Sequence, residues 1–237
     1  MASLRLITWN CRVGGFRKKA KHIAPLRPDV LAVQEVEPID GVLTFEGETQ
    51  PTFRDRCADP VFPQRAIGVF SYTDTQLRPV DLPGPLFSFR RYEARRRDLS
   101  FNVIAVWPWQ TKSSKTAYRQ VHEGLFAHAN WIRERPTVIL GDFNSNASFK
   151  GPNWRDLVDL LRPLGLTSAY HRYSNDEPGR ERQPTHFHRG REERAFHLDY
   201  CFIPEEWAQH LRSVEIGSFA DWHEVSDHAP VMVTLEI

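Results

Sequence analysis

The chain has 237 residues, of which 41% are hydrophobic and 26% are charged, as in an ordinary globular protein with a sizeable core. Its 31 Lys and Arg residues nearly balance its 30 Asp and Glu residues, so the net charge of +1 gives no whole-molecule argument for a polyanionic partner. No apolar stretch reaches membrane-spanning length and the amino terminus lacks a signal-peptide pattern, so we expect a cytoplasmic protein with no membrane partner.

The first half of the chain alternates apolar strands with less regular segments. The pattern of residues 4–10 predicts a strand, and helical spacing follows over residues 16–28 until Pro28 stops it. Residues 29–35 predict a second, buried strand, and residues 36–64 are expected to form a loop with an irregular helix. Further strands are predicted at residues 65–71, 85–92 and 99–107.

The second half continues the alternation. A helix is expected between Ser113 and Pro136, and the apolar run Val138–Leu140 then predicts a buried strand that stops at Gly141. The chain goes on with helices near residues 154–162 and 204–211, a polar segment over 171–194, and strands over 196–203 and 229–235. Strands alternating with helices, without a Pro/Gly/Ser-rich linker, predict a single α/β (α+β) domain over residues 1–237, with two packed sheets and helices outside.

Polar side chains stand where the predicted strands end. In a layered sheet protein such residues gather at one edge, where ligands bind. Several carboxylates there repel one another and lose hydration, and a hard divalent cation relieves that cost. Oxygen ligands suit Mg²⁺ or Mn²⁺, and such an ion binds substrate phosphate oxygens, so the pattern predicts phosphoester hydrolysis. The strand-end residues are Asn10, Glu35, Asp142, Asn144, Asp199, Asp227 and His228.

Each of these residues also has a structural interpretation. Asp142 and Asn144 could form a turn that only ends a strand, and Asn10 could cap the turn after it. Asp199 could pair with Arg194, and His228 could be a hydrogen-bonded core histidine. The combination of all of them favours a functional site.

Five short motifs give the chain a family resemblance that extends from Leu4 to Val233. The chain resembles the endonuclease/exonuclease/phosphatase superfamily, the group of DNase I and the exonuclease III-type apurinic endonucleases. The resemblance implies a four-layer sandwich of two mixed sheets flanked by helices, and metal-dependent hydrolysis of a phosphodiester or phosphomonoester. The motifs, in family order, are Trp9-Asn10, Val33-Gln34-Glu35, Gly141-Asp142-Phe143-Asn144, Leu198-Asp199-Tyr200 and Ser226-Asp227-His228-Ala229-Pro230.

The resemblance also implies a role for each matching residue. Glu35 would be the principal ligand of Mg²⁺ or Mn²⁺, with Asn10 beside it and Asp227 completing the metal side. The other four would act on the substrate. Asp142 would orient or deprotonate the attacking water, and Asn144 would hold a phosphate oxygen. Asp199 would hydrogen-bond His228 and favour its imidazolium, which then stabilises charge on the phosphoryl group.

The chain departs from the family pattern at positions that could contact substrate. Many nucleic-acid-cleaving members carry a carboxylate where this chain has Arg12, which removes a possible second metal ligand and adds a positive charge. Trp107 stands where many relatives place a His or Tyr, and it could be a stacking platform or rim packing. Tyr118 could supply a phenol, although its helix position favours packing, and His186 could line the mouth of the site.

The sequence leaves the substrate open. Nucleic acid is favoured by arginine clusters at residues 90–97 and 189–194, by Trp107 and Trp109 as stacking surfaces, and by the implied chemistry. A small phosphorylated molecule, such as a nucleotide, is the alternative, because the net charge is near zero. A non-catalytic binding module is a third possibility, and a complete set of site residues speaks against it. We expect a monomer.

Overall fold

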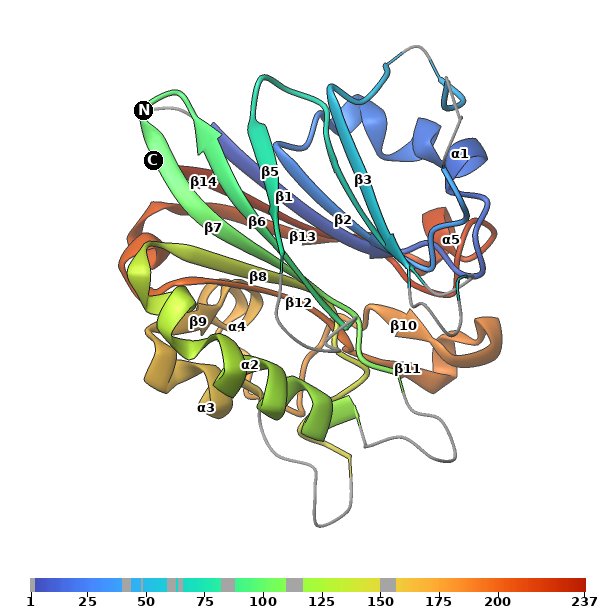
Figure 1. The fold of residues 1–237 in the computed structure, drawn as a ribbon. Coiled ribbons are helices and arrows are strands. Elements are labelled where there is room, and N and C mark those ends of the chain that lie inside the picture. Colours follow the sequence, from blue (N-terminus) through green and yellow to red (C-terminus); the bar gives the residue numbers. More distant parts are fainter. Residues whose placement is uncertain are drawn as a thin grey trace.

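The computed structural model describes residues 3–39, 44–47, 49–58, 63, 66–81, 88–109, 117–149 and 157–237. Within these residues two six-stranded mixed sheets face each other (Figure 1). In spatial order, the first sheet contains β13 (Leu211–Ile216), β14 (Val231–Glu236), β1 (Ser3–Asn10), β2 (Val30–Gln34), β4 (Ala66–Ser71) and β3 (Phe53–Ala58). The second contains β5 (Gln76–Val80), β6 (Phe89–Arg96), β7 (Leu99–Val106), β8 (Thr137–Asp142), β12 (Asp199–Pro204) and β9 (Leu166–Ser168).

Each sheet has one parallel pair at its centre, β1 with β2 and β7 with β8, and antiparallel pairs elsewhere among the described strands. A small hairpin of β10 (His186–Phe187) and β11 (Ala195–Phe196) lies beside them. The helices are α1 (Phe16–Lys19), α2 (Ala117–Glu134), α3 (Leu157–Leu161), α4 (Ala169–Ser174) and α5 (Phe219–Trp222), with short 3₁₀ turns η1 (Ala20–His22), η2 (Ala24–Leu26), η3 (Arg162–Leu164), η4 (His188–Gly190), η5 (Glu192–Arg194) and η6 (Glu205–His210).

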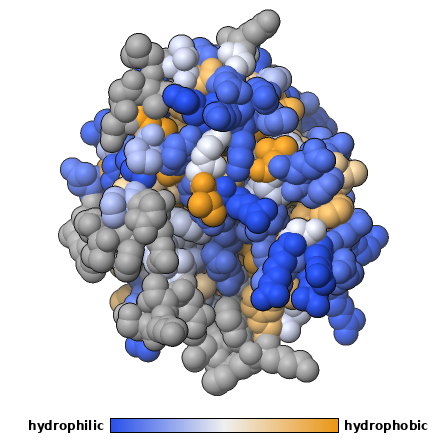
Figure 2. Space-filling model, turned by 90° about the vertical axis from the view of Figure 1, so that its right-hand side faces the viewer, coloured by the Kyte–Doolittle hydropathy of each residue, from blue (hydrophilic) through white to orange (hydrophobic). Residues whose placement is uncertain are grey.

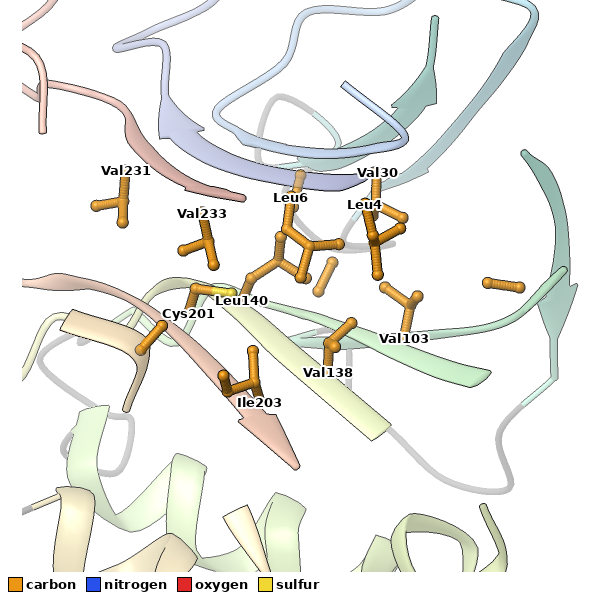
Figure 3. Close-up of a cluster of buried hydrophobic side chains, with 14 of the residues drawn as sticks. Leu4, Leu6, Val30, Val103, Val138, Leu140, Cys201, Ile203, Val231 and Val233 are labelled. Atoms are coloured by element: carbon orange, nitrogen blue, oxygen red, sulfur yellow. The ribbon is translucent and has the colours of Figure 1, made fainter. Parts of the chain in front are cut away.

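Three apolar clusters hold these layers together. The first lies between the sheets, where alternate residues such as Leu6, Val138 and Val233 point inward from both sides (Figure 3). The second packs the outer face of the first sheet against α1 and the turns after it. The third packs the second sheet against α2 and α3. This arrangement of helix, sheet, sheet and helix confirms the predicted four-layer α/β sandwich.

Most of the predicted elements are present, and the differences concern polar segments. The expected loop over residues 36–64 contains β3, and β5, β9, β10 and β13 also have no predicted counterpart. The helical spacing after Phe16 forms α1 and two 3₁₀ turns rather than one helix. The expected beginnings of the helices before Ala117 and Leu157, and of strands before Ala66 and Ser88, lie outside the described residues. No helix in the described part of the chain combines the length and apolar character needed to cross a membrane.

Candidate functional site

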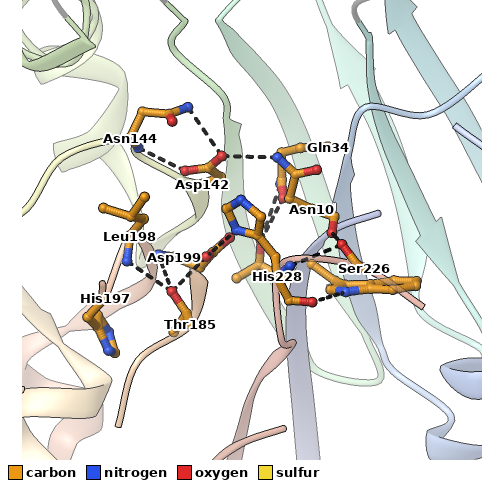
Figure 4. A network of polar contacts seen from close by, with 12 residues as sticks. Asn10, Gln34, Asp142, Asn144, Thr185, His197, Leu198, Asp199, Ser226 and His228 are labelled. Carbon is orange, nitrogen blue, oxygen red and sulfur yellow. Dashed lines mark hydrogen bonds and ion pairs between the residues drawn. The ribbon is translucent and has the colours of Figure 1, made fainter. Parts of the chain in front are cut away.

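The strand-end residues of both sheets meet around one cavity of about 800 Å³. Asn10 ends β1 and Glu35 follows β2 in the first sheet, while Asp142 ends β8 in the second. The antiparallel register of β8 and β12 places Asp199 directly opposite Asp142. The cavity is lined by the predicted residues Asn10, Glu35, Asp142, Asn144, Asp227 and His228, and Asp199 lies fully buried behind His228 (Figure 4). The structure therefore brings together all seven.

Asp142 is buried and held by three hydrogen bonds. Its Oδ1 accepts from the backbone N–H of Asn144 at 2.8 Å. Its Oδ2 accepts from the side-chain amides of Asn10 at 3.1 Å and Asn144 at 3.2 Å (Figure 4). Burial and the neighbouring carboxylate of Asp199 nevertheless raise the pKa of Asp142 well above its ordinary range, although His228 and these hydrogen bonds act the other way. A carboxyl group fixed in position with a raised pKa is suited to accept a proton.

His228 forms a close pair with Asp199. Its Nδ1 lies 2.8 Å from Oδ2 of Asp199, so the other ring nitrogen is the one left for the cavity. Burial lowers the pKa of His228, but the charge of Asp199 and the hydrogen bond to it prevail and raise the pKa to about 9. The pairing with Asp199 therefore favours the imidazolium form of His228 at the wall of the cavity.

Glu35 is anchored by the loop that follows β1. Its Oε1 accepts from Asn10 at 3.1 Å and its Oε2 from the backbone N–H of Val13 at 2.5 Å. Glu35, Arg12, Val13 and Asn144 all have a left-handed backbone, with φ of 64°, 53°, 47° and 48°. Non-glycine residues are strained in this region, and such strain gathers at functional sites, where surrounding contacts enforce it. Four such residues line this one cavity, which is a further indication that the cavity is a functional site.

The residues predicted to bind metal fit a hard divalent cation. Glu35, Asn10 and Asp227 offer oxygen atoms at the first-sheet side of the cavity. Each Glu35 oxygen accepts one protein hydrogen bond, which leaves a lone pair for a cation. Within the described residues, the tightest group of potential ligands is a different one, Asp142, Asp199 and His228, with ligand atoms within 4.8 Å. Oδ1 of Asp199 is buried there without a hydrogen-bond partner in the described structure, so this oxygen can accept a further hydrogen bond or bind a cation.

Three of the four residues predicted to contact substrate line the cavity, namely Arg12, Trp107 and His186. Arg12 Nε lies 3.6 Å from Asp227 Oδ2, in a loose ion pair at the rim. The ring of His186 lies 4.4 Å from that of His228, and burial together with this neighbour lowers the pKa of His186 to about 4. Tyr118 is absent from the lining and packs on the apolar cluster below the second sheet. It therefore occupies the packing position that its helix pattern favours.

Two hydroxyl groups support the site without having been predicted to do so. Thr185 Oγ1 donates to Asp199 Oδ2 at 2.7 Å and accepts the backbone N–H groups of Leu198 and Asp199. Ser226 Oγ donates to the carbonyl of Asn10 and accepts the backbone N–H of His228 (Figure 4). Thr185 lies in a polar segment with no periodic pattern, so only its place beside the predicted His186 could have suggested it.

The arginine cluster of residues 90–97 does not face the cavity. Arg90 pairs with Asp55 at 3.4 Å, and Arg96 pairs with the buried Asp29 at 2.8 Å. Arg91 lies over the ring of Trp131. These three guanidinium groups therefore bind partners within the protein. Among the described residues, Arg12 is the arginine that lines the cavity.

The two-sheet sandwich with this polar cavity defines an α/β protein of the DNase I-like class. Two similar solved structures are the endonuclease domain of TRAS1, a telomere-specific non-LTR retrotransposon, and the 3′-5′ exonuclease (NExo) from Neisseria meningitidis. The first has a TM-score of 0.68 at 13% identity over 99% of both chains. The second has a TM-score of 0.66 at 16% identity over 99% of this chain and 100% of the other. At such identities the likeness shows a common fold.

The family follows from the sequence itself. The model of the Endonuclease/Exonuclease/phosphatase family matches residues 7–228, and the chain belongs to this family. Membership places it among hydrolases of phosphoester bonds. A comparison with curated protein sequences gave no significant match.

Proposed function

We propose that this protein is a Mg²⁺- or Mn²⁺-dependent phosphodiesterase that cleaves nucleic acid. The observation that carries the proposal is the placement of Asp142 at the cavity floor, hydrogen-bonded to Asn10 and Asn144 and facing the Asp199–His228 pair. It puts a proton acceptor and a fixed positive charge on one cavity, which are the two groups that in-line attack of water on phosphorus requires from a protein.

Asp142 would take the proton of the attacking water, since its hydrogen bonds fix its position and its raised pKa suits that task. His228, held as an imidazolium by Asp199, would stabilise the charge that develops on the phosphoryl oxygens. Asn144 donates both amide hydrogens within the protein, to Asp142 and to the carbonyl of Pro108 at 2.9 Å. It would therefore exchange one of these bonds for a phosphate oxygen when substrate binds.

The cation would be held by Glu35, Asn10 and Asp227, whose oxygens suit Mg²⁺ or Mn²⁺. When bound, such an ion neutralises phosphate charge and acts as a Lewis acid. Arg12 pairs only loosely with Asp227, so its guanidinium can turn to a phosphate of the substrate.

Nucleic acid is favoured by three features of the cavity: Arg12 at the rim, the partly buried Trp109, and the lining by His186. Trp107 is only 6% exposed and packs in the cluster between the sheets, so it supports the ring of Trp109, 5.3 Å away, more than it offers a stacking face of its own. The similar solved structures are described as an endonuclease and an exonuclease, which agrees with this substrate class. A small phosphorylated molecule is the second candidate, because Arg90, Arg91 and Arg96 are used within the fold and provide no wide basic surface.

An activity screen tests the proposal. The purified protein is incubated with Mg²⁺ or Mn²⁺ and with plasmid, abasic duplex, single-stranded oligonucleotides or a chromogenic phosphodiester. We expect turnover of a nucleic acid that EDTA abolishes. Turnover of the small diester alone would favour the second candidate, and no metal-dependent turnover of any substrate would refute the enzymatic proposal.

The metal ligands are tested by titration calorimetry with Mg²⁺ and Mn²⁺. Glu35→Gln is expected to weaken binding about 10-fold or more, because a charged oxygen donor becomes a neutral one. Glu46→Gln is the matched control, since Glu46 lies outside the cavity and pairs with Lys21. Equal affinity in the Glu35 variant and the wild type would remove Glu35 from this role.

A further inference from the structure

Val13 combines an exposed apolar side chain with a backbone conformation that is unfavourable for its type. Its φ of 47° lies in the left-handed region, which β-branched residues rarely adopt. The residue is 86% exposed and lines the cavity. Figure 2 views the end of the molecule where α1, α5 and β10 lie, and there hydrophobic residues form small, separate spots. Gly or Asn would be less strained at this position, so folding does not explain the valine.

The backbone around Val13 is fixed by the site itself. The N–H groups of Arg12, Val13 and Gly14 donate to Asn10 Oδ1, Glu35 Oε2 and the Glu35 carbonyl at 3.0, 2.5 and 2.8 Å. On the other side, Lys19 Nζ contacts the carbonyls of Cys11 and Arg12. These contacts use only main-chain atoms of Val13. They hold its isopropyl group in a defined place at the rim, where no described residue buries it.

Apolar groups from both sheets therefore face the same cavity. Val13 follows β1 of the first sheet, whereas Trp107 and Trp109 follow β7 of the second, and all three line the cavity. The floor between them carries Asp142 and His228. A ligand that matches this arrangement has a phosphate at the floor and a flat, partly apolar group at the rim. A nucleoside phosphate has this form, whereas a sugar phosphate or inorganic phosphate lacks the flat group.

We propose that Val13 is a specificity-determining residue whose side chain packs on the base or sugar of the nucleoside attached to the scissile phosphate. The inference rests on the proposed phosphodiesterase function and assigns a residue that contacts the nucleoside part of its substrate. The free-energy cost of the left-handed backbone at Val13 would then be offset by the binding free energy that its side chain contributes when substrate is present.

Two substrates with the same scissile bond separate nucleoside recognition from chemistry. They are thymidine 5′-(p-nitrophenyl phosphate) and methyl p-nitrophenyl phosphate, which share the leaving group. For Val13→Gly and Val13→Asn we expect kcat/KM on the thymidine diester to fall about 10-fold, the factor that partial burial of one valine provides. On the methyl diester the loss should be several-fold smaller, because that substrate has no nucleoside for the side chain to contact while the main-chain bond to Glu35 is kept. The ratio of the two kcat/KM values is therefore the readout.

Stability measurements complete the test. Thermal unfolding of Val13→Gly is expected at the wild-type temperature or above it, since glycine relieves the strain at φ 47°. Arg97→Gly is the matched control, because Arg97 has a φ of 54° outside the cavity, and it should leave both substrates unaffected. Equal rates of wild type and Val13→Gly on the thymidine diester, or an equal loss on both diesters, would overturn the inference.

Failure of the proposed function gives a different result. In that case the wild type turns over neither diester, and the affinity of a fluorescently labelled oligonucleotide becomes the readout. Weaker binding by Val13→Gly than by Arg97→Gly would support Val13 as a nucleoside contact in a protein that is not this enzyme. No binding by the wild type would overturn both proposals.

Discussion

Two buried carboxylates in the second half of the chain have opposite surroundings. Asp142 faces the carboxylate of Asp199, and burial together with that charge raises its pKa. Burial also raises the pKa of Glu181, but hydrogen bonds from His171, the Gly179 N–H and Asn146, at 3.1, 3.0 and 3.1 Å, more than offset it and lower the pKa to about 2. The neighbours of Asp142 favour its protonated form, whereas those of Glu181 favour its ionised form.

The contrast distinguishes the polar cluster proposed to be catalytic from one that serves the fold. Both contain a histidine at hydrogen-bond distance from a carboxylate, namely His228 with Asp199 and His171 with Glu181. Only the first opens on a cavity, leaves a buried carboxylate oxygen without a partner and places two carboxylates side by side. A buried carboxylate whose hydrogen-bond donors are all present stabilises the fold. A buried carboxylate that lacks some of these donors can still bind a ligand or a proton.

Asp142→Asn should produce the largest effect, and that effect should be on activity. Loss of a general base lowers kcat by about 10³-fold, within the usual range for such groups. Asparagine removes the repulsion from Asp199, but its NH₂ group faces a donor that Asp142 accepted from, so the two changes in stability oppose each other and the free energy of unfolding should change by no more than about 1 kcal/mol. Steady-state kinetics and urea unfolding of the same preparation check both statements. A variant with wild-type kcat would end the assignment of Asp142 as the base.

Glu181→Ala should show the converse. Its removal leaves His171 Nε2 and the Gly179 N–H without their acceptor, whereas Asn146 keeps the carbonyl of His197. We therefore expect a loss of about 3 kcal/mol in the free energy of unfolding, as for a broken buried pair. kcat per folded molecule should remain within about twofold of the wild type. Urea unfolding measures the first quantity and active-site-normalised kinetics the second. An unchanged stability would show that the Glu181 cluster contributes little to the fold.

The same carboxylate predicts a pH dependence of stability. The pKa of Glu181 is about 2 in the folded chain against an ordinary 4.5, so between these values the unfolded chain binds more protons. Its contribution is fully present above pH 4.5 and is lost as the pH falls toward 2. Urea unfolding from about pH 5 to pH 3 should therefore show a steeper decline for the wild type than for Glu181→Gln. Parallel curves would contradict the lowered pKa.

Thr185 connects the two regions, because the segment that contains Glu181 leads directly to it. Thr185→Val removes the hydroxyl that binds Asp199 Oδ2 and two backbone N–H groups. We expect a loss of about 2 kcal/mol in stability from the unpaired groups and a decrease in kcat of about 10-fold from the misplaced Asp199–His228 pair. Thr185→Ser, which keeps the hydroxyl, should restore both. A stability loss without any loss of kcat would make Thr185 purely structural.

The residues of the candidate site could be located from the sequence because their signals are local. Asn10 and Glu35 follow apolar runs that form neighbouring parallel strands of the first sheet. Asp142 ends a strand of the second sheet, and the packing of the two sheets brings it to the same cavity. The unpredicted strands of the two six-stranded sheets, β3, β5, β9 and β13, are the edge strands, where one face is solvated and apolar runs are short. β5 even contains Pro79, which edge strands tolerate.

The Glu181 cluster could not be predicted in the same way. Its members come from residues 146, 171, 179 and 181, and no spacing relates them. The polar segment over residues 171–194 has the composition of a solvated loop, yet tertiary contacts bury Glu181 and His171 almost completely. Thr185 is hidden for the same reason, because its role depends on the position of Asp199 across the fold. Local patterns locate strand ends, and they do not locate networks that only packing assembles.

Arg12 should give the smallest effect, because it belongs to neither buried cluster. Its ion pair with Asp227 is 3.6 Å long and its side chain is 52% exposed, so Arg12→Gln should change stability by less than about 0.5 kcal/mol. If Arg12 binds a substrate phosphate, the slope of log affinity against log salt should fall by about 1 for an oligonucleotide, since one fewer counterion is released. Fluorescence anisotropy at several salt concentrations, with calcium in place of magnesium to prevent turnover, measures the slope.

Arg27→Gln is the control, because Arg27 lies outside the cavity at the other end of the sandwich. Equal slopes for Arg12→Gln and Arg27→Gln would leave Arg12 as a partner of Asp227 alone.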